Sequence, residues 1–461
     1  MSPLAIFFVL LNVVALLAMP RRWAPIPFLI GACYMTLTQR VDLGPFSFTI
    51  IRLLIAAGVA RVVIRGERLV GGVNGMDRIM FVWAGWAVFS SVFHSTTSEG
   101  HPLTFRLGLV YNVLGIYFLF RIFLQSIDDV VHLIKIAACV LVPVALEMVQ
   151  EHITQRNLFS VFGGVPESSW IREGRLRAQG PFAHPILAGT VGAVCLPMMA
   201  GLYRLHARTA LIGGLACLSM VIASSSSGPL MSLIFGVGAL FCWRWRHLTH
   251  QMRVAAVIAY VMLEFVMTAP AYYLIARINL IGSSTGWHRA RLIEMGIAHL
   301  KEWWLAGTDY TRHWMPTGVS WSPDHTDITN YYLKMGVIGG LPLMGLLIAA
   351  IVIGFRFTGQ SLQLSKEEPM DRQFMIWSVG AALLTHVATC ISVSYFDQSY
   401  IFLFLNLALI SSLRSAILLQ EEETEENEKT EDDELNRHPR GEMGASSLGT
   451  PSAGVAGLRF S

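Results

Sequence analysis

The chain has 461 residues, of which 54% are hydrophobic and 14% are charged. Soluble domains carry about a quarter charged residues, so this composition excludes an ordinary soluble protein and predicts an integral membrane protein. The formal net charge is only +3, and the sequence contains no basic patch interleaved with aromatic residues of the kind that binds nucleic acid.

Apolar stretches recur along the chain from near residue 3 to near residue 418. A transmembrane helix needs about 20 predominantly apolar residues, and about thirteen stretches reach or approach that length. They are residues 3–19, 24–38, 46–64, 79–94, 107–124, 130–149, 183–202, 209–223, 227–243, 254–275, 331–355, 373–393 and 396–418. The second stretch is short and contains prolines, so the predicted fold is an all-α, polytopic transmembrane helix bundle of about 12–13 spans.

Five short loops between these stretches are rich in basic residues. They are residues 21–22, 61–68, 203–208, 244–253 and 356–372. If every stretch crosses the membrane, all of these loops lie on one side, and basic short loops are retained in the cytoplasm. We therefore expect residues 1–418 to form a membrane domain with an external N-terminus.

Two longer loops, residues 150–182 and 276–330, are then predicted on the outer side, where long loops are translocated regardless of charge. In the second loop, apolar residues recur with helical spacing between residues 287 and 305, which predicts a helix lying at the membrane surface and ending near Gly307. The expected apolar stripe consists of Ile293, Ile297, Leu300 and Trp304.

The C-terminal segment, residues 419–461, has a different composition. It is densely acidic from Glu421 to Glu434 and then rich in Gly, Ser and Pro. Such a segment cannot bury enough apolar surface to fold, so it is predicted to be a disordered cytoplasmic tail.

A basic cluster precedes one of the apolar stretches. Arg172, Arg175, Arg177 and His184 are followed directly by apolar sequence up to residue 202. Charge at a bilayer boundary is costly to desolvate unless an anion pairs with it, and guanidinium groups match phosphate oxygens. The cluster is therefore a candidate site for a lipid diphosphate. The alternative is a solvated basic loop that pairs with neighbouring glutamates or with lipid headgroups.

A second pair of candidate diphosphate-binding residues, Arg289 and Arg291, lies at the start of the predicted surface helix. Because residues two apart on a helix point in different directions, only one of the pair can face the edge of the apolar side. Arg289 is the residue that we select.

His325 precedes the stretch 331–355 and is flanked by Asp324 and Asp327. A carboxylate can orient an imidazole and raise its basicity, as a general base requires, so His325 and Asp327 are the candidate catalytic residues. The alternative is a polar loop end. Asp309, Asp324 and Asp327 could instead hold a divalent cation, but their spacing matches no recognised metal loop, and we predict neither a metal site nor a cofactor.

Three segments carry a resemblance to a known family. They are RAQGPFAHPILAG at 177–189, the stretch from WHR at 287–289 to LAG at 305–307, and HTDITNYYLKMGVIG at 325–339. In order and position they resemble the bacterial O-antigen ligase and polymerase superfamily, which are polytopic glycosyltransferases. That family often has Asn directly after the histidine, whereas this chain has Thr326. The departure leaves open whether His325 or Asp327 is the base.

The resemblance implies a glycosyltransferase of the bacterial cytoplasmic (inner) membrane that acts on its outer face. The implied donor is a saccharide linked to undecaprenyl diphosphate, and the implied acceptor is a saccharide or a molecule of the lipid A type. Arg177 and Arg289 would stabilise the departing diphosphate, and no cofactor would be needed. Further expected partners are membrane lipids and other polysaccharide-assembly proteins, but not nucleic acid. Polymerase and ligase share these motifs, so the product is an exopolysaccharide or an O-antigen.

Two other classes of protein compete with this interpretation. A transporter or flippase of lipid-linked saccharide would carry inward-facing charges or broken helices near the middle of the membrane. A non-catalytic scaffold would recruit other proteins through the acidic tail. The concentration of charge in the two long loops favours the enzyme.

Overall fold

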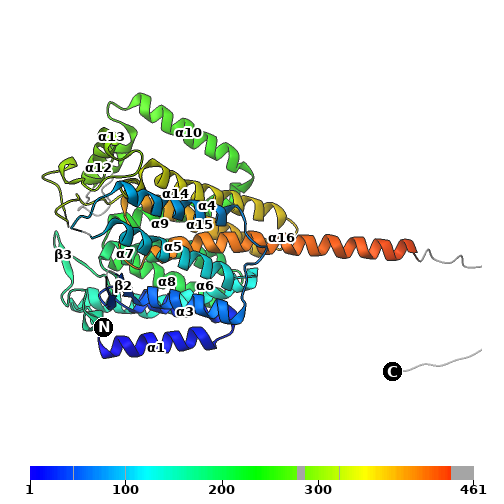
Figure 1. Cartoon of the computed structure of the whole chain (residues 1–461). Coiled ribbons are helices and arrows are strands. Elements are labelled where there is room, and N and C mark those ends of the chain that lie inside the picture. Colours follow the sequence, from blue (N-terminus) through cyan, green and yellow to red (C-terminus); the bar gives the residue numbers. More distant parts are fainter. Residues whose placement is uncertain (45, 99, 278–285, 321, 438–461) are drawn as a thin grey trace, which may run out of the picture. The chain divides into compact units, whose positions relative to one another are not determined.

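The structure is a computed structural model that describes residues 1–461 except 45, 99, 278–285, 321 and 438–461 (Figure 1). The chain divides into two compact units, Met1–Leu418 and Leu419–Ser461. The described residues are predominantly helical, with two short β-hairpins. The predicted all-α fold is confirmed.

Each predicted apolar stretch contains a helix. The helices are α1 (Pro3–Ala18), α2 (Ile26–Tyr34), α3 (Ile50–Arg65), α4 (Gly75–Phe89), α5 (Pro102–Phe123), α6 (Ile127–Thr154), α7 (Pro185–Leu202), α8 (Ala207–Ala223), α9 (Ser227–Phe241), α10 (Thr249–Val266), α11 (Leu274–Arg277), α12 (Gly286–Ala298), α13 (Leu300–Trp303), α14 (Tyr331–Leu364), α15 (Met370–Ser392) and α16 (Tyr400–Arg437). The hairpins pair β1 (Arg40–Leu43) with β2 (Phe46–Thr49), and β3 (Trp170–Arg172) with β4 (Arg175–Arg177). In the described part of the chain, seven helical runs are long and apolar enough to cross a membrane, counting α9 and α10 as one run. The protein is therefore a multi-pass membrane protein.

The first unit packs around α7, most of whose residues are buried. Small residues allow its backbone to approach its neighbours closely, as is common between transmembrane helices. A Cβ atom added at Gly192 of α7 would lie 2.5 Å from the carbonyl oxygen of Cys217 in α8, and one added at Gly213 of α8 would lie 2.6 Å from the Cβ of Ala138 in α6. In contrast, α10 lies at the periphery of the bundle and buries none of its side chains (Figure 1).

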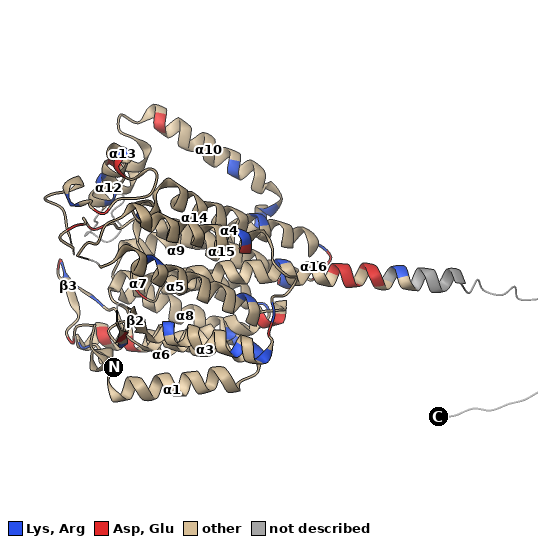
Figure 2. Cartoon of the chain, viewed as in Figure 1, with Lys and Arg blue, Asp and Glu red and all other residues tan. Residues whose placement is uncertain are grey.

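The helices of the first unit run alternately between two ends, and the basic short loops gather at one of them (Figure 2). There Arg21 contacts Asp129 at the start of α6, and Arg204 after α7 contacts Asp371 at the start of α15. The long loops gather at the opposite end, which we call the site end and define by His184, Ser226 and Asn330, the residues just before α7, α9 and α14.

The predicted surface helix is only partly correct. It is divided into α12 and α13 at His299, which leaves the helical region with φ −96° and ψ 19°. Leu292 and Trp303 are buried in a small apolar cluster with residues of α14, whereas Ile297 and Trp304 of the expected stripe are 59% and 52% exposed. The segment thus has two apolar faces, and the sequence periodicity identified the one that does not pack on the protein.

The prediction for the tail is wrong in its first part, because α16 continues as a helix to Arg437. Where the structure describes their burial, residues 420–427, 429 and 430 are exposed, as expected for a segment without a core. Glutamate is a good helix former, no Gly or Pro interrupts residues 400–437, and extending an existing helix avoids the cost of nucleation. Residues 438–461 lie outside the described part of the chain.

The break in α14 at Gly339 and Gly340 positions the second long loop. Gly340 has φ +75° and ψ −175°, a conformation that is essentially confined to glycine. The break lets the N–H of Leu341 donate to Trp304 O at 2.8 Å, and the N–H of Thr308 donates to Val337 O at 2.9 Å. The chain after α13 is therefore held on α14 by backbone hydrogen bonds.

We predict that Gly340→Ala lowers the free energy of unfolding by about 1–3 kcal/mol, because a Cβ atom there would lie 2.2 Å from the carbonyl oxygen of Leu305. Thermal unfolding in detergent measures the effect. Gly345→Ala is the matched control in the same helix, since its Cβ meets nothing within 4 Å, and it should be neutral or stabilising by up to about 1 kcal/mol. Equal stability of the two variants would contradict this role of the break.

Candidate functional site

The hairpin β3–β4 carries the first arginine cluster. Its two turn residues, Glu173 and Gly174, have φ of 52° and 74°, as a two-residue type I′ turn requires. Arg172 pairs with Arg175, and Trp170 pairs with Arg177. Because side chains alternate between the two faces of a strand, all four of these residues lie on the same face of the hairpin.

Arg177 is the buried member of this face and is 8% exposed. Its Nη2 donates to Ser226 Oγ at 2.7 Å, just before α9, and the next N–H, of Ala178, donates to Ala223 O at 3.0 Å. Its Nε is buried and has no hydrogen-bond acceptor among the described residues. Burial, together with the charges of Arg172 and Arg289, lowers the pKa of Arg177 to about 10.

A buried carboxylate that the sequence analysis did not select fixes the strand bearing Arg177. Glu151 Oε2, near the end of α6, accepts the N–H groups of Gln179 and Gly180 at 3.0 and 2.8 Å. Glu151 Oε1 accepts the hydroxyl of Ser169 at 3.0 Å. Both ends of the hairpin are therefore tied to α6. A glutamate near the end of an apolar stretch was the only signal in the sequence.

His184 is the residue just before α7, and its Nδ1 accepts the N–H of Ile186 at 3.1 Å. Its ring lies 6.3 Å from that of Trp170 and 6.4 Å from that of Phe396, measured between centroids. Burial and the neighbouring charges of Arg177 and Arg172 lower the pKa of His184 to about 4. The imidazole is therefore neutral near pH 7.

The loop between α15 and α16 also contributes to the site end, although the sequence analysis did not identify it. Asp397 is buried, and its Oδ2 accepts the N–H of Ala183 at 2.9 Å. Gln398 donates through Nε2 to Pro181 O at 3.2 Å. These contacts hold the segment between β4 and α7 in place. Their residues are far apart in the sequence and form no recognisable motif.

Arg289 reaches the same region from α12 and is 7% exposed. A Cβ atom added at Gly228, in the first turn of α9, would lie 3.6 Å from Arg289 Nη2. Arg289 Nε is buried without a hydrogen-bond acceptor in the described part of the chain. Burial and the charge of Arg172, partly offset by Asp327, lower the pKa of Arg289 to about 10. Arg172, Arg177 and Arg289 therefore form one group, which we call the arginine cluster.

Asp327 lies beside the arginine cluster. Burial raises its pKa, and the charges of His288, Arg289 and Lys334 oppose that rise. The Nε2 of His288 lies 3.1 Å from the backbone oxygen of Asp327, and the Asp327 N–H donates to Val319 O at 2.9 Å. A partly buried carboxylate next to an arginine can accept a proton or orient a hydroxyl group.

Three predicted site residues have other surroundings. His325 Nδ1 lies 3.1 Å from Thr311 Oγ1, and none of the contacts described for it involves the arginine cluster. Arg291 pairs with Glu294 at 2.5 Å, and Glu294 also accepts the hydroxyl of Tyr273. Arg175 is exposed near the hairpin turn. The selection of Arg289 rather than Arg291 thus agrees with the burial of the two side chains.

The three aspartates that could have held a cation make different contacts. Asp309 pairs with His94 at 2.5 Å. Asp324 accepts the N–H and the hydroxyl of Ser98, which lowers its pKa. Asp327 lies beside Arg289 instead. The contacts of Asp309 and Asp324 join the second long loop to the connection between α4 and α5.

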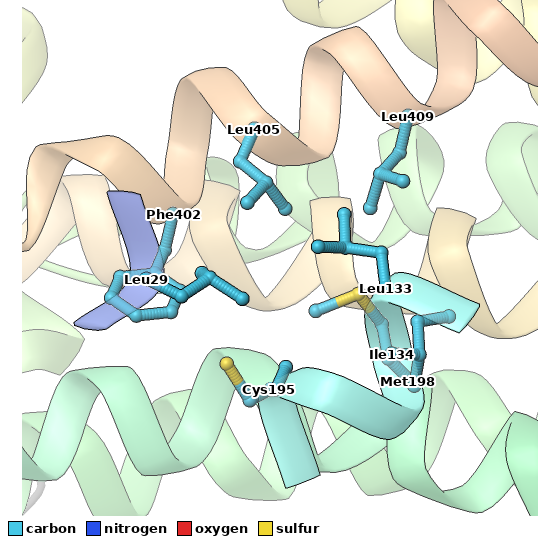
Figure 3. A pocket seen from close by; sticks show the side chains of 9 residues that line it. Leu29, Leu133, Ile134, Cys195, Met198, Phe402, Leu405 and Leu409 are labelled. Carbon is cyan, nitrogen blue, oxygen red and sulfur yellow. The ribbon is translucent and has the colours of Figure 1, made fainter. Parts of the chain in front are cut away.

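The arginine cluster lies where α7 and α9 begin, and the N-termini of helices favour anions because of their free N–H groups and their dipoles. Two buried guanidinium groups, each with an unused N–H, add further donors. In contrast, the cavity in Figure 3, between α2, α6, α7 and α16, is lined by side chains such as Leu29, Cys195 and Phe402. It offers no polar group to orient a ligand.

We predict that His184 makes stability depend on pH between about 6.5 and about 4. Its pKa is depressed in the folded state, so the folded protein binds fewer protons than the unfolded chain in that range. Stability is therefore complete above about pH 6.5 and falls, by at most about 3 kcal/mol, as the pH drops toward 4. Thermal unfolding across this range should show a smaller slope for His184→Asn, which can still cap α7.

The exposed His152 provides the control for this measurement, because His152→Asn should keep the slope of the unmodified protein. An equal slope for His184→Asn and the unmodified protein would contradict the assignment.

A scan against models of protein families and a search of curated proteins found no match to this chain.

Proposed function

We propose that this protein is a membrane glycosyltransferase whose donor is a saccharide linked to a polyprenyl diphosphate. It polymerises or ligates a surface polysaccharide at the outer face of a bacterial cytoplasmic membrane. The observation that carries the proposal is the arginine cluster, because Arg177 and Arg289 are both more than nine-tenths buried and each has an unused Nε.

Electrostatics gives the reason why the cluster fits a diphosphate. A buried cation without a counter-ion costs several kcal/mol, and neither Arg177 nor Arg289 forms an ion pair with a carboxylate among the described residues. Burial is the main cause of their lowered pKa values, and the charge of Arg172 lowers both further. A diphosphate headgroup supplies compensating charge and enough oxygens for several guanidinium N–H donors. Its lipid chain would remain in the membrane beside the site end.

In the proposed reaction, a hydroxyl oxygen of the acceptor attacks the anomeric carbon of the donor sugar. The bond from that carbon to the diphosphate oxygen breaks, and its electron pair stays on the diphosphate. Arg177 and Arg289 stabilise the negative charge that develops there, and preorganised donors in a site shielded from water are most effective at this step. The proton of the hydroxyl passes to a base.

Asp327 and His325 remain the two candidates for that base. Asp327 lies beside Arg289, and burial raises its pKa, so it is a better proton acceptor than an exposed aspartate. His325 lies two residues away and contacts Thr311. The position of Asp327 favours it, so Asp327→Asn should lower turnover more than His325→Gln does.

Purified protein supplied with the lipid-linked saccharide of its host tests the assignment of the arginines. Arg177→Ala and Arg289→Ala should each lower turnover by about 10²–10³-fold, as expected when a donor to the developing charge is removed. Arg291→Ala is the matched control, two residues along α12 and paired with Glu294, and its turnover should change only a few-fold.

The outcome that overturns the proposal is an Arg289→Ala enzyme as active as Arg291→Ala. In cells, loss of the arginine cluster should make lipid-linked saccharide accumulate at the outer leaflet. Accumulation at the cytoplasmic leaflet would indicate a flippase instead. The length of the residual polymer separates a polymerase from a ligase.

A further inference from the structure

A second group of polar side chains lies in the long loop, apart from the arginine cluster. Glu302 lies at its centre, with His299 Nδ1 2.7 Å from Glu302 Oε1 and His313 Nε2 2.9 Å from Glu302 Oε2. One ligand atom from each of these residues lies within 4.8 Å of the other two. Two imidazoles and one carboxylate form the ligand set of many zinc sites that keep a fourth position open.

The three side chains converge because of how the chain folds locally. His299 lies at the junction of α12 and α13, and Glu302 follows three residues later, so the two share one face of a helical turn. His313 comes from a short 3-10 turn, Arg312–Trp314, which the chain reaches after leaving α13. No motif in the sequence marks this arrangement, since the two histidines are fourteen positions apart.

Aromatic contacts hold both imidazole rings in place. Tyr310 stacks on His313 with centroids 5.3 Å apart and ring planes 7° apart, and Trp314 stacks on His299 at 5.7 Å and 13°. Trp314 Nε1 also donates to Glu302 Oε2 at 3.1 Å. Such support of ligand side chains by a second layer of residues is typical of metal sites and strengthens their affinity.

The three side chains are accessible to solvent. The side chains of His299, Glu302 and His313 are 28%, 38% and 39% exposed, so an ion can reach them from water. Cobalt titration distinguishes a metal site from a hydrogen-bonded group that makes the same contacts without a metal ion.

We infer that His299, Glu302 and His313 bind a divalent first-row transition-metal ion, with Zn²⁺ the best match to two imidazoles and one carboxylate. The ion is held by His299 Nδ1, His313 Nε2 and a Glu302 oxygen, and water completes the coordination. Each imidazole then carries its proton on the other ring nitrogen. The site is independent of the proposed glycosyltransferase reaction.

A bound metal ion would link α13 to the 3-10 turn and so restrain the chain between them. The intervening residue Thr308 is already bonded to α14 through Val337, and Thr311 contacts His325. A bound ion would therefore fix the position of the loop relative to α14 without taking part in chemistry. Its removal should make the backbone between residues 304 and 320 exchange amide hydrogens faster.

Cobalt(II) titration of the full-length protein, purified without a histidine tag, tests the inference. We expect visible absorption bands of four- or five-coordinate cobalt at one ion per chain, which Zn²⁺ then abolishes. His299→Ala, Glu302→Gln and His313→Ala should each weaken binding by at least about 100-fold. Trp314→Phe keeps the stacked ring but loses the donor to Glu302, and it should weaken binding by about 10–100-fold.

His152→Ala is the matched control, because His152 is an exposed histidine at the site end, and it should bind cobalt as the unmodified protein does. Absence of the bands, or the same bands in His299→Ala, overturns the inference. Amide exchange of metal-free protein checks that a variant keeps its fold. If His313→Ala loosens the loop, the cobalt affinity of Glu302→Gln decides whether the metal site exists. That variant keeps the size of the side chain and a hydrogen-bond acceptor.

Discussion

The site end depends on one constraint: two guanidinium groups are buried there without forming an ion pair with a carboxylate among the described residues. Arg177 comes from a hairpin, and Arg289 comes from a helix of a different loop. Burial lowers the pKa of both arginines, and the charge of Arg177 also lowers the pKa of His184. Such a concentration of charge is costly in a protein interior. It persists because the surrounding structure holds both arginines in place, which is typical of a binding site for an anion.

Several elements of the first unit hold the segments around the arginines in place. Glu151 ties the hairpin to α6, and Asp397 ties the segment before α7 to the loop between α15 and α16. The break in α14 at Gly340 holds the chain after α13. Each contact joins residues that are distant in the sequence, so the position of the arginines is a property of the whole first unit rather than of one loop.

The long loop has two chemically different regions. Near its start, Arg289 belongs to the arginine cluster and lies beside Asp327, whereas His299 and His313 gather around Glu302 farther along the chain. The first region is suited to a phosphate and a proton acceptor, and the second to a metal ion that stiffens the loop.

The sequence by itself determined the membrane class and the helical stretches, because hydropathy is a local property of the chain. It could not determine which apolar face of α12 packs, the helical continuation of α16, or the contacts of Glu151 and Asp397. Only the tertiary structure decided that Asp327, and not His325, lies beside the arginines, and that two histidines fourteen positions apart meet one glutamate. The physical reason is that these contacts depend on how separate helices and loops approach in space, which no local pattern of residues encodes.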